Sequence, residues 1–268
     1  MQPYYEHIFH TDKDFPVIFH LDTLAKDDFF ISHWSKNIEL LYVTEGEIIA
    51  TIDEERICAS VGDIVIINSD MVHHVASVTE CSSYYCLIID KALCIESKLY
   101  SEEFLLQSLV TDSYTAEVFE KIISEYSRSE KYYKTAIKAY TMLLLTHLYR
   151  SFSTQGKELK VKTHTTHIDT VRKCITYIQE NYAEPISLDE LSLAVGYSKY
   201  YLLHSFKRVT GSTIVAYLNL FRCLMARDLI TDGKGMKEVA TLCGFQNLSY
   251  FTRTYKKFMG VSPSQDRK

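Results

Sequence analysis

The chain lacks any apolar run long enough to cross a bilayer. Leu40–Val43, Cys86–Ile89 and Met142–Leu145 are among its longest apolar runs, whereas a membrane-spanning helix needs about 20 residues. The opening residues 1–7 contain no basic segment leading into an apolar one, so they do not resemble a secretory signal. We therefore expect a cytoplasmic protein that has no membrane partner.

Paired cysteines are also missing. The seven cysteines are odd in number and no two of them show C-x-x-C spacing, which disfavours a disulfide framework and a zinc site, so we expect reduced and mostly buried thiols. The sequence has 4 proline residues and 1 tryptophan, while hydrophobic residues make up 47% and charged residues 24% of it. This composition excludes a disordered or fibrous chain. At roughly 150 residues per domain, the length predicts about two domains.

Acidic and basic residues are divided unequally along the chain. Residues 168–268 carry 14 Lys and Arg against 9 Asp and Glu, a net charge of +5, although the whole chain carries −5. Residues 1–167 therefore carry a net charge of −10. A basic part joined to an acidic part indicates that only the basic part meets a polyanion. The polar segment 153–167, which lacks apolar periodicity, predicts a linker between a domain over 1–152 and a domain over 168–268.

Short runs rich in Val, Ile and Tyr, separated by turn residues, predict an antiparallel barrel or sandwich over about residues 1–95. The expected strands are Ile38–Val43, Glu47–Ile52, Arg56–Ala59, Ile64–Ile67, Val72–Val78 and Tyr84–Ile89. From about Glu102 the apolar spacing becomes helical, so we expect helices over about 100–152. The last of them, about Tyr133–Phe152, is apolar around much of its girth. It packs either on its own barrel or against a helix of a second subunit.

One spacing inside the barrel region points to a binding site. The residues concerned are His33, Ser35, Glu39 and Gly46, followed by Gly62, Asn68, Asp70 and His73. They resemble the two cupin motifs, which in full supply three His and one Glu to a divalent metal. Ser35 stands where one of those His residues would be, so we expect no bound metal and no other cofactor. His33, Glu39 and His73 are then either an inert interior or a polar wall that contacts a small effector.

A helical unit occurs twice in residues 168–268. Leu191, Val195, Gly196 and Tyr197 recur as Val239, Cys243, Gly244 and Phe245, and Leu202, Phe206, Lys207, Arg208 and Gly211 recur as Phe251, Tyr255, Lys256, Lys257 and Gly260. Each unit predicts a helix, a glycine turn and a second helix. This is the helix-turn-helix layout, whose second helix can enter the major groove of DNA.

Capping residues mark the boundaries of the expected helices. They are Ser187 with Glu190 as a capping box, Ser198 and Asn247 at two further helix starts, and Gly196 and Gly244 at helix ends. An apolar stripe between the units predicts one connecting helix over about Thr213–Thr231. With a short closing helix after Pro263, the domain would contain seven helices.

The second unit carries specific motifs. They are Val239-Ala240-x-x-Cys243-Gly244-Phe245, Ser249-Tyr250-Phe251-x-Arg253-x-Tyr255-Lys256 and Gly260-Val261-Ser262-Pro263, with Arg222, Ala226 and Leu229 on the connecting helix. Together they resemble the AraC/XylS family of bacterial transcription regulators. The resemblance implies a two-domain α+β chain. A cupin-like antiparallel β-barrel with flanking helices comes first, and an all-α domain of two helix-turn-helix units joined by a long helix follows.

The resemblance and the helical spacing together indicate which side chains meet DNA. The base-reading candidates are Tyr200, Leu203 and His204 on the first recognition helix and Ser249, Tyr250, Thr252 and Arg253 on the second. The phosphate-binding candidates are Lys199, Lys207, Arg208, Asn247, Lys256 and Lys257. The sequence leaves the roles of three of these residues open. Leu203 could add packing instead, Tyr250 could belong to the core, and Arg253 could contact a guanine or a phosphate.

We therefore predict a sequence-specific DNA-binding transcription regulator, and not an enzyme, that is controlled by a small-molecule effector bound in the barrel. Its expected partners are double-stranded DNA, the effector, RNA polymerase and a second copy bound through the helix at about 133–152. The two recognition helices should lie about 34 Å apart on one face. Two alternatives are a metal-binding cupin, enzyme or sensor, fused to a DNA-binding domain, and a barrel that serves dimerisation only.

Overall fold

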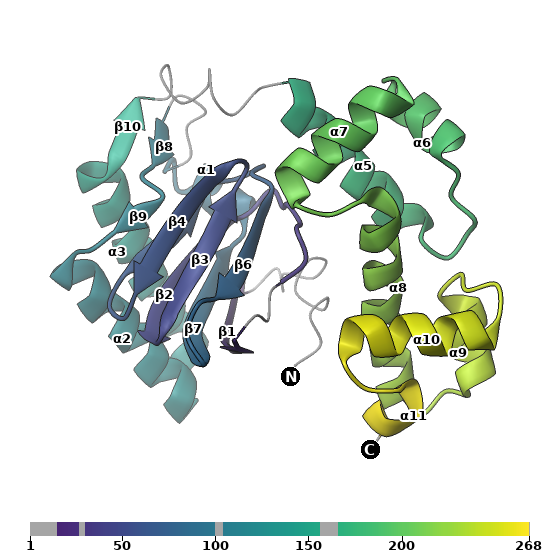
Figure 1. Cartoon of the computed structure of the whole chain (residues 1–268). Helices are drawn as coiled ribbons and strands as arrows, with labels where there is room; N and C mark the ends of the chain where they lie inside the picture. The colour runs from purple at the N-terminus through teal and green to yellow at the C-terminus, as the bar shows by residue number, and fades with distance from the viewer. Residues whose placement is uncertain (1–14, 27–29, 100–103, 156–165, 268) are drawn as a thin grey trace. The chain divides into compact units, whose positions relative to one another are not determined.

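The computed structural model describes residues 15–26, 30–99, 104–155 and 166–267 (Figure 1). They form two compact units: a barrel unit over the described residues of 15–155 and a helical unit over 166–267. Residues 156–165 of the expected linker lie outside the described residues. The start of that linker, Ser153–Gln155, is a strand, so the linker prediction began three residues too early.

Antiparallel strands build the barrel unit. They are β1 Val17–Ala25, β2 Ile38–Glu45, β3 Glu47–Ile52, β4 Glu55–Ser60, β5 Ile64–Ile67, β6 His73–Ser77, β7 Cys81–Ile89, β8 Phe104–Leu106, β9 Leu109–Val110 and β10 Ser153–Gln155. One sheet has the order β1-β7-β2-β5-β9, a second has the order β4-β3-β6, and β10 pairs with β8. The six strands expected from the sequence are confirmed, apart from small differences at their ends. Strand β1 is a further strand, which the sequence analysis missed.

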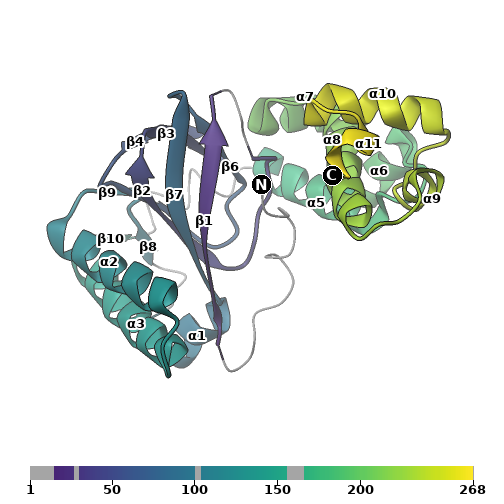
Figure 2. The same ribbon diagram turned by 90° about the horizontal axis from the view of Figure 1, so that it is seen from below.

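The five-stranded sheet is apolar on both faces. In β2, Leu40 and Tyr42 pack on one side with the helices, and Leu41 and Val43 pack on the other side with the three-stranded sheet. Side chains alternate along a strand, so a sheet buried on both faces needs nearly continuous apolar runs. Figure 2 shows this layering, in which the five-stranded sheet lies between the helices and the three-stranded sheet.

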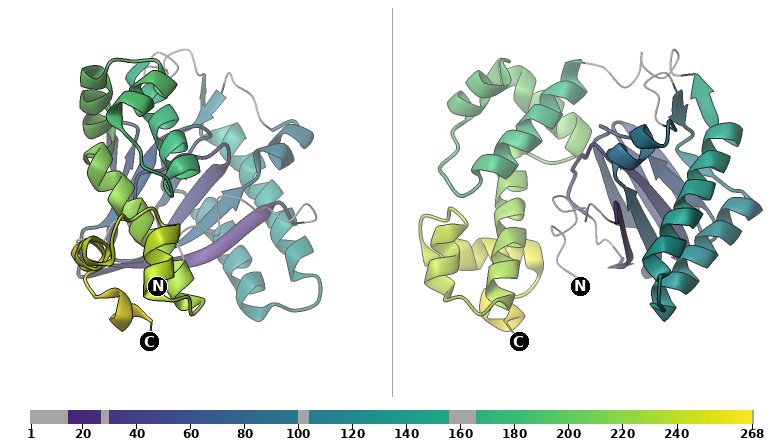
Figure 3. Two further views of the ribbon diagram at one scale, coloured as in Figure 1. Left: turned by 90° about the vertical axis from the view of Figure 1, so that its right-hand side faces the viewer. Right: turned by 180° about the vertical axis from the view of Figure 1, so that it is seen from behind.

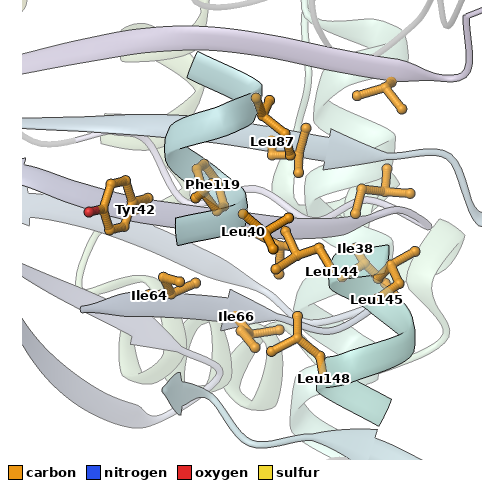
Figure 4. Close-up of a cluster of buried hydrophobic side chains, with 14 of the residues drawn as sticks. Ile38, Leu40, Tyr42, Ile64, Ile66, Leu87, Phe119, Leu144, Leu145 and Leu148 are labelled. Carbon is orange, nitrogen blue, oxygen red and sulfur yellow. The ribbon is translucent and has the colours of Figure 1, made fainter. Parts of the chain in front are cut away.

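Three helices cover the outer face of the larger sheet. They are α1 Lys91–Glu96, α2 Ser113–Arg128 and α3 Tyr133–Ser151. On α3, Leu144, Leu145 and Leu148 are fully buried and lie against Leu40 and Ile66 of the sheet (Figure 4). The barrel of the same chain therefore covers one side of α3, which was one of the two possibilities for this helix.

The helical prediction is wrong over the described residues 104–109. Phe104–Leu106 forms β8 and Leu109–Val110 forms β9. Here β9 extends the five-stranded sheet beside β5, and β8 pairs with β10, 49 residues away at Leu105 and Thr154. Six residues are too few for periodicity to separate a helix from a strand, and these strands depend on partners that are remote in the sequence.

Seven helices build the helical unit over the described residues 166–267, as expected. They are α5 Thr166–Asn181, α6 Leu188–Val195, α7 Lys199–Thr210, α8 Ile214–Thr231, α9 Met236–Leu242, α10 Leu248–Met259 and α11 Pro263–Asp266. The predicted caps are confirmed. Ser187 and Glu190 form a capping box, and Ser198 and Asn247 accept the backbone N–H groups of Tyr201 and Tyr250.

A buried arginine ties the two helix-turn-helix pairs together. Arg222 of α8 is only 8% exposed. Its guanidinium donates from Nε to the carbonyl of Tyr182 at 2.7 Å and from Nη2 to the carbonyl of Glu184 at 2.8 Å. These carbonyls follow α5, and the guanidinium also lies 5.9 Å from the centre of the Phe245 ring in the second glycine turn. One side chain thus joins α5, α8 and the second turn.

Gly244 lets this turn approach the same loop. Its φ is +72°, and a Cβ at this position would lie 2.6 Å from the carbonyl oxygen of Tyr182 and 2.7 Å from that of Ala183. Only glycine combines a left-handed backbone with such a close approach. Gly196 also has a positive φ, of +84°, but it has open space where a Cβ would be. Gly244 therefore provides both a positive φ and a close approach of two segments, whereas Gly196 provides the positive φ without a close approach. The two glycines occupy equivalent places in the repeat.

Within the part of the chain that the structure describes, no single helix is long and apolar enough to span a bilayer. By length and composition alone, α7 and α8 pass that test only as a pair, and they are bent by 57° at the break between them.

The cysteines of the structure are free thiols. Five of them are buried as expected, whereas Cys58 and Cys81 are exposed. No disulfide supports either unit within the described residues, and stability there depends on packing and hydrogen bonds.

We predict that Gly244→Ala destabilises the helical unit far more than Gly196→Ala. The positive φ costs about 1–2 kcal/mol at either position. Only at Gly244 would the new methyl group also collide with two backbone carbonyls, so we expect a further loss of several kcal/mol there. Urea unfolding followed by circular dichroism measures both free energies, with Gly196→Ala as the matched control. Equal losses would contradict the close approach.

Candidate DNA interface and barrel site

The first recognition helix, α7, presents the face that the sequence predicted. Leu202, Ser205, Phe206 and Val209 are buried, and they fix the rotation of the helix. The predicted contact residues Lys199, Tyr200, Leu203, His204, Lys207 and Arg208 are all exposed.

Tyr200 and His204 form an aromatic pair on this exposed face. Tyr200 is 82% exposed, and its ring stacks on that of His204 at a centroid distance of 6.4 Å and an interplanar angle of 21°. Leu203, at 39% exposed, keeps enough free surface for an apolar contact. The face therefore offers ring edges, one imidazole and one apolar side chain to a groove.

The second recognition helix, α10, divides its candidates into two groups. Ser249, Thr252 and Arg253 are exposed, whereas Tyr250 is half-buried and packs against the core of the second helix pair. The hydroxyl oxygen of Tyr250 accepts a hydrogen bond of 3.0 Å from Nδ2 of the buried Asn219 on α8. The guanidinium of Arg253 lies 5.9 Å from the Tyr250 ring centre. This placement favours the second of the two roles left open for Tyr250, a core position that supports Arg253.

Helices α7 and α10 lie on the same side of α8. Both lie in front of it in Figure 1, and both lie along the upper edge of the helical unit in Figure 2. Two further views agree (Figure 3). Since both helices also expose their predicted faces, the helical unit carries two polar helix surfaces on one side.

The phosphate candidates lie around the ends of these helices. Lys207 and Arg208 belong to the last turn of α7, and Lys256 and Lys257 to the last turn of α10. All four are exposed. The Lys199 ammonium forms an ion pair with Asp189 of α6, but both groups are largely exposed, so the pair contributes little to stability. Asn247 has its side-chain oxygen engaged as the cap of α10.

In the barrel unit, the structure brings His33, Glu39 and His73 together. Nε2 of His73 lies 3.2 Å from Oε2 of Glu39, and the His33 and His73 rings are 4.1 Å apart at their centres. Both Glu39 and His73 are buried. Ser35, which stands at the place of a missing cupin ligand, donates its hydroxyl to Oε1 of Glu39 at 3.1 Å. Ser35 thus forms a hydrogen bond to Glu39 at the position where the full cupin motif has a metal-binding histidine.

Charges within this triad are arranged as a buried ion pair beside a neutral imidazole. Burial opposes the charged forms, but the Glu39 carboxylate outweighs it and raises the pKa of His73. His73 in turn lowers the pKa of Glu39 to about 2, although burial acts against this shift. Burial and the charge of His73 lower the pKa of His33 to about 4. At neutral pH Glu39 is therefore an anion and His33 is a neutral ring, and the Glu39 carboxylate stabilises the cationic form of His73.

A second polar cluster in the same unit escaped the sequence analysis. His20 and Asp22 of β1 and Cys86 of β7 offer ligand atoms that all lie within 4.8 Å of one another. The cluster was missed because β1 was not recognised as a strand. The polar residues alternating with Phe19 and Leu21 were the signal that could have revealed it. Either triad contains the donor types that bind divalent transition metals.

Two sequence families match the chain. The family described as an AraC-like ligand binding domain matches residues 15–145, and the family described as a helix-turn-helix domain matches residues 191–268. The melibiose operon regulatory protein of Escherichia coli K12 is 24% identical over 256 residues, covering 88% of this chain and 83% of that protein. An HTH-type transcriptional regulator of Pseudoalteromonas carrageenovora is 31% identical over 113 residues, covering 42% of this chain and 68% of that protein.

Solved structures share the fold. ToxT from Vibrio cholerae O395 superimposes with a TM-score of 0.54 at 14% identity, covering 94% of this chain and 97% of that chain. ToxT from strain SCE256 with an unsaturated fatty acid bound gives a TM-score of 0.51 at 15% identity, covering 94% of each chain. At these identities the likeness concerns the arrangement of the elements.

We predict that Glu39→Gln destabilises the barrel unit by about 1–3 kcal/mol, because it removes the counter-ion of a buried imidazolium. The pKa of His73 should fall, and NMR titration of the histidines measures this shift. The raised pKa of His73 and the lowered pKa of Glu39 mean that stabilisation by the pair is complete between about 4.5 and about 6.5. It fades as the pH rises through the folded value of His73, and also as the pH falls from 4.5 through the folded Glu39 value of about 2. The stability difference between wild type and variant should therefore shrink at high pH. Ser35→Ala is the control. It removes the hydrogen bond that Ser35 donates to the Glu39 carboxylate and the one that it accepts from the Asn37 N–H, and should cost about 1–3 kcal/mol, but it leaves the Glu39–His73 pair and the raised pKa of His73 in place. An unchanged His73 pKa in Glu39→Gln would contradict the ion pair.

Proposed function

The chain belongs to the AraC family of transcription regulators, and from this premise we propose that it reads its operator with α7 and α10 in two neighbouring segments of the major groove. It is a DNA-binding regulator whose first part is a ligand-binding domain. The observation that carries the proposal is the pair of capped helices that expose polar faces on the same side of α8. A separation of about 34 Å would match one turn of B-DNA.

On α7 we assign base contacts to Tyr200, Leu203 and His204. The imidazole of His204 can donate or accept a hydrogen bond, and Leu203 can contact a thymine methyl group. On α10 we assign them to Ser249, Thr252 and Arg253. The guanidinium of Arg253 suits the two acceptors of guanine, and the half-buried Tyr250 supports it from the side.

Phosphate contacts would position the domain without reading sequence. We assign them to Lys199, Lys207, Arg208, Asn247, Lys256 and Lys257. The net charge of +5 on residues 168–268 supports this role. Lys199 would have to leave Asp189 to reach a phosphate, which costs little because the pair is exposed.

We propose that a small-molecule effector contacts His33, Glu39 and His73 in the barrel unit. The names of the relatives point to different small molecules. One is named for the melibiose operon, and ToxT has been solved with an unsaturated fatty acid bound. For this chain the chemistry of the triad favours an effector with hydroxyl groups, because Nδ1 of His33 donates to the carbonyl of Ile31, so that Nε2 of the neutral ring acts as a hydrogen-bond acceptor.

Asn68 provides a physical connection between the barrel and the segment that leads to the helical unit. Its Nδ2 donates to the carbonyl of Leu106 at 2.9 Å, and its Oδ1 accepts the N–H of Leu106 at 3.0 Å. Leu106 pairs with Ser153 in the β8–β10 ladder. We propose that effector binding changes the strength of this attachment, so that β10 is held or released and the reach of the following segment changes.

Domain roles follow from the same premise. We propose a sensing and dimerisation domain over 1–152 and a DNA-binding domain over 168–268. Tyr132, Ala139 and Leu143 are exposed along one side of α3, which suits a second copy of the chain. The protein would act in the cytoplasm by binding rather than catalysis, and it would influence RNA polymerase at its promoters.

Genomic footprinting of the protein would reveal the operator, and a protein without reproducible sites would refute the proposal.

We predict that Arg253→Ala and His204→Ala each weaken binding to the footprinted operator by about 1–3 kcal/mol and relax the preference for single bases. The measurement is fluorescence anisotropy at moderate salt, with every base pair of the site substituted in turn. Lys256→Ala is the matched control on α10. It should weaken all sequences alike and reduce the slope of log K against log salt by about 1. Unchanged binding by both Arg253→Ala and His204→Ala would show that the assigned faces are wrong.

We predict that Asn68→Ala loosens β10 without unfolding the barrel. Two backbone groups of Leu106 would lose their partners, at a cost of about 1–3 kcal/mol. Amide hydrogen exchange should rise at Leu106 and at the β8–β10 pairs, while exchange in β2 and β7 stays at the wild-type rate. A reporter gene should show altered basal expression in the same variant. Unaltered exchange at β8 and β10 would rule out the attachment.

A further inference from the structure

We propose that His20, Asp22 and Cys86 bind one divalent cation of the zinc class inside the barrel unit. The proposal concerns the barrel unit alone and does not depend on how the helical unit reads DNA. It also differs from the effector contacts assigned above, which involve His33, Glu39 and His73.

The antiparallel pairing of β1 and β7 brings the three side chains together. His20 lies directly opposite Cys86 in the register of this pair. Asp22 lies two residues farther along β1, so its side chain falls on the same face as that of His20. The same face carries Leu24 and Ile88, which belong to the interior between the two sheets. The three potential ligands therefore project into the interior from the same side of one strand pair.

The distances within the cluster suit a shared ion. Nε2 of His20 lies 3.0 Å from Oδ2 of Asp22, and one ligand atom from each of the three residues lies within 4.8 Å of the others. Nitrogen and oxygen ligands at about 2.0–2.1 Å from a tetrahedral zinc ion lie about 3.3 Å from each other. The sulfur of Cys86 lies within 4.8 Å of the other two ligand atoms, so closing of the three side chains around an ion would complete the ligand bonds.

Solvent can reach the cluster from one side. Cys86 is 4% exposed, whereas the side chains of His20 and Asp22 are 12% and 19% exposed. The thiol thus forms the floor of the cluster, and the imidazole and the carboxylate form its rim. An ion can enter past the rim and exchange its waters for protein ligands one at a time.

The charges around Cys86 favour a cation. Burial raises the pKa of its thiol well above the ordinary value, and the carboxylates of Glu39 and Asp22 raise it further. A thiolate is therefore disfavoured while no positive charge is near. A bound cation reverses this balance, because it stabilises the thiolate and offsets the carboxylates, and the proton of Cys86 leaves to solvent on binding.

The ligand types select among cations. Magnesium and calcium prefer sites made of oxygen atoms alone, whereas thiolate and imidazole suit zinc and its transition-metal neighbours. Three protein ligands leave a fourth position for water or for an oxygen of another molecule. The cluster thus has the composition of an open zinc site rather than that of a closed structural one.

Titration of the reduced full chain with Co²⁺, a coloured substitute for Zn²⁺, tests the proposal. We expect one equivalent to bind and to produce a thiolate-to-cobalt charge-transfer band in the near ultraviolet, which excess Zn²⁺ removes. Cys86→Ser should abolish the band, and Asp22→Asn should weaken Co²⁺ binding about tenfold or more. Zn²⁺ binding measured by calorimetry should release about one proton in wild type and fewer in Cys86→Ser.

Two variants serve as controls. Cys94→Ser removes another buried cysteine of the barrel unit, and His33→Asn alters the neighbouring triad. Both should retain the band and the affinity, and thermal melting establishes that every variant is folded. The proposal is overturned if folded wild type gives no thiolate band. It is equally overturned if the band survives Cys86→Ser, or if binding is lost in His33→Asn but kept in Asp22→Asn.

Discussion

The helical unit depends on one buried contact, in which Arg222 and Gly244 meet the loop that follows α5. The guanidinium satisfies the carbonyls of Tyr182 and Glu184, and the missing side chain of Gly244 lets the second turn approach the same loop. A buried charge that is bound only to carbonyls is expensive to disturb, because any shift leaves it without partners. The two helix-turn-helix pairs are thereby held at a fixed orientation about α8. The proposed reading of two grooves at once would need this rigidity, since a small rotation at the junction would displace one helix from its groove.

The barrel unit depends on a central sheet that must accommodate polar residues in an apolar interior. Its five-stranded sheet is buried on both faces, by helices on one side and by the three-stranded sheet on the other. Such a layer contributes much apolar burial, and the polar residues inside it must therefore pair with one another. The Glu39–His73 ion pair, with Ser35 beside it, meets that requirement. The cluster of His20, Asp22 and Cys86 meets it in another way, because His20 pairs with Asp22, while burial, reinforced by the carboxylates of Glu39 and Asp22, raises the pKa of the Cys86 thiol. This difference gives the two triads different chemistry within one interior.

Coupling between the units requires that a ligand favour one of two states. The β8–β10 ladder is the element that we propose to have two states; it is three residues long, and Asn68 anchors it at Leu106. Short ladders of this kind open at low cost, whereas the long β1–β7 and β2–β7 pairs keep the barrel intact. A change in the interior can thus reach the start of the segment that leads to DNA without a rearrangement of the core.

The sequence by itself determined the features that depend on neighbours within a few residues. The caps Ser187, Ser198 and Asn247, the exposed face of α7 and the six central strands follow from local spacing and local hydrogen bonds. Strand β1, strands β8–β10 and the position of Tyr250 did not follow. Tertiary structure decided these, because they depend on partners 31 to 72 residues away, such as Asn219 for Tyr250, Leu105 for Thr154 and Ile89 for Val17. The cluster of His20, Asp22 and Cys86 belongs to the same class, since only the register of two strands remote in sequence brings its members within reach of one ion. Local patterns specify which way a side chain faces, whereas strand register and helix packing determine what it meets there.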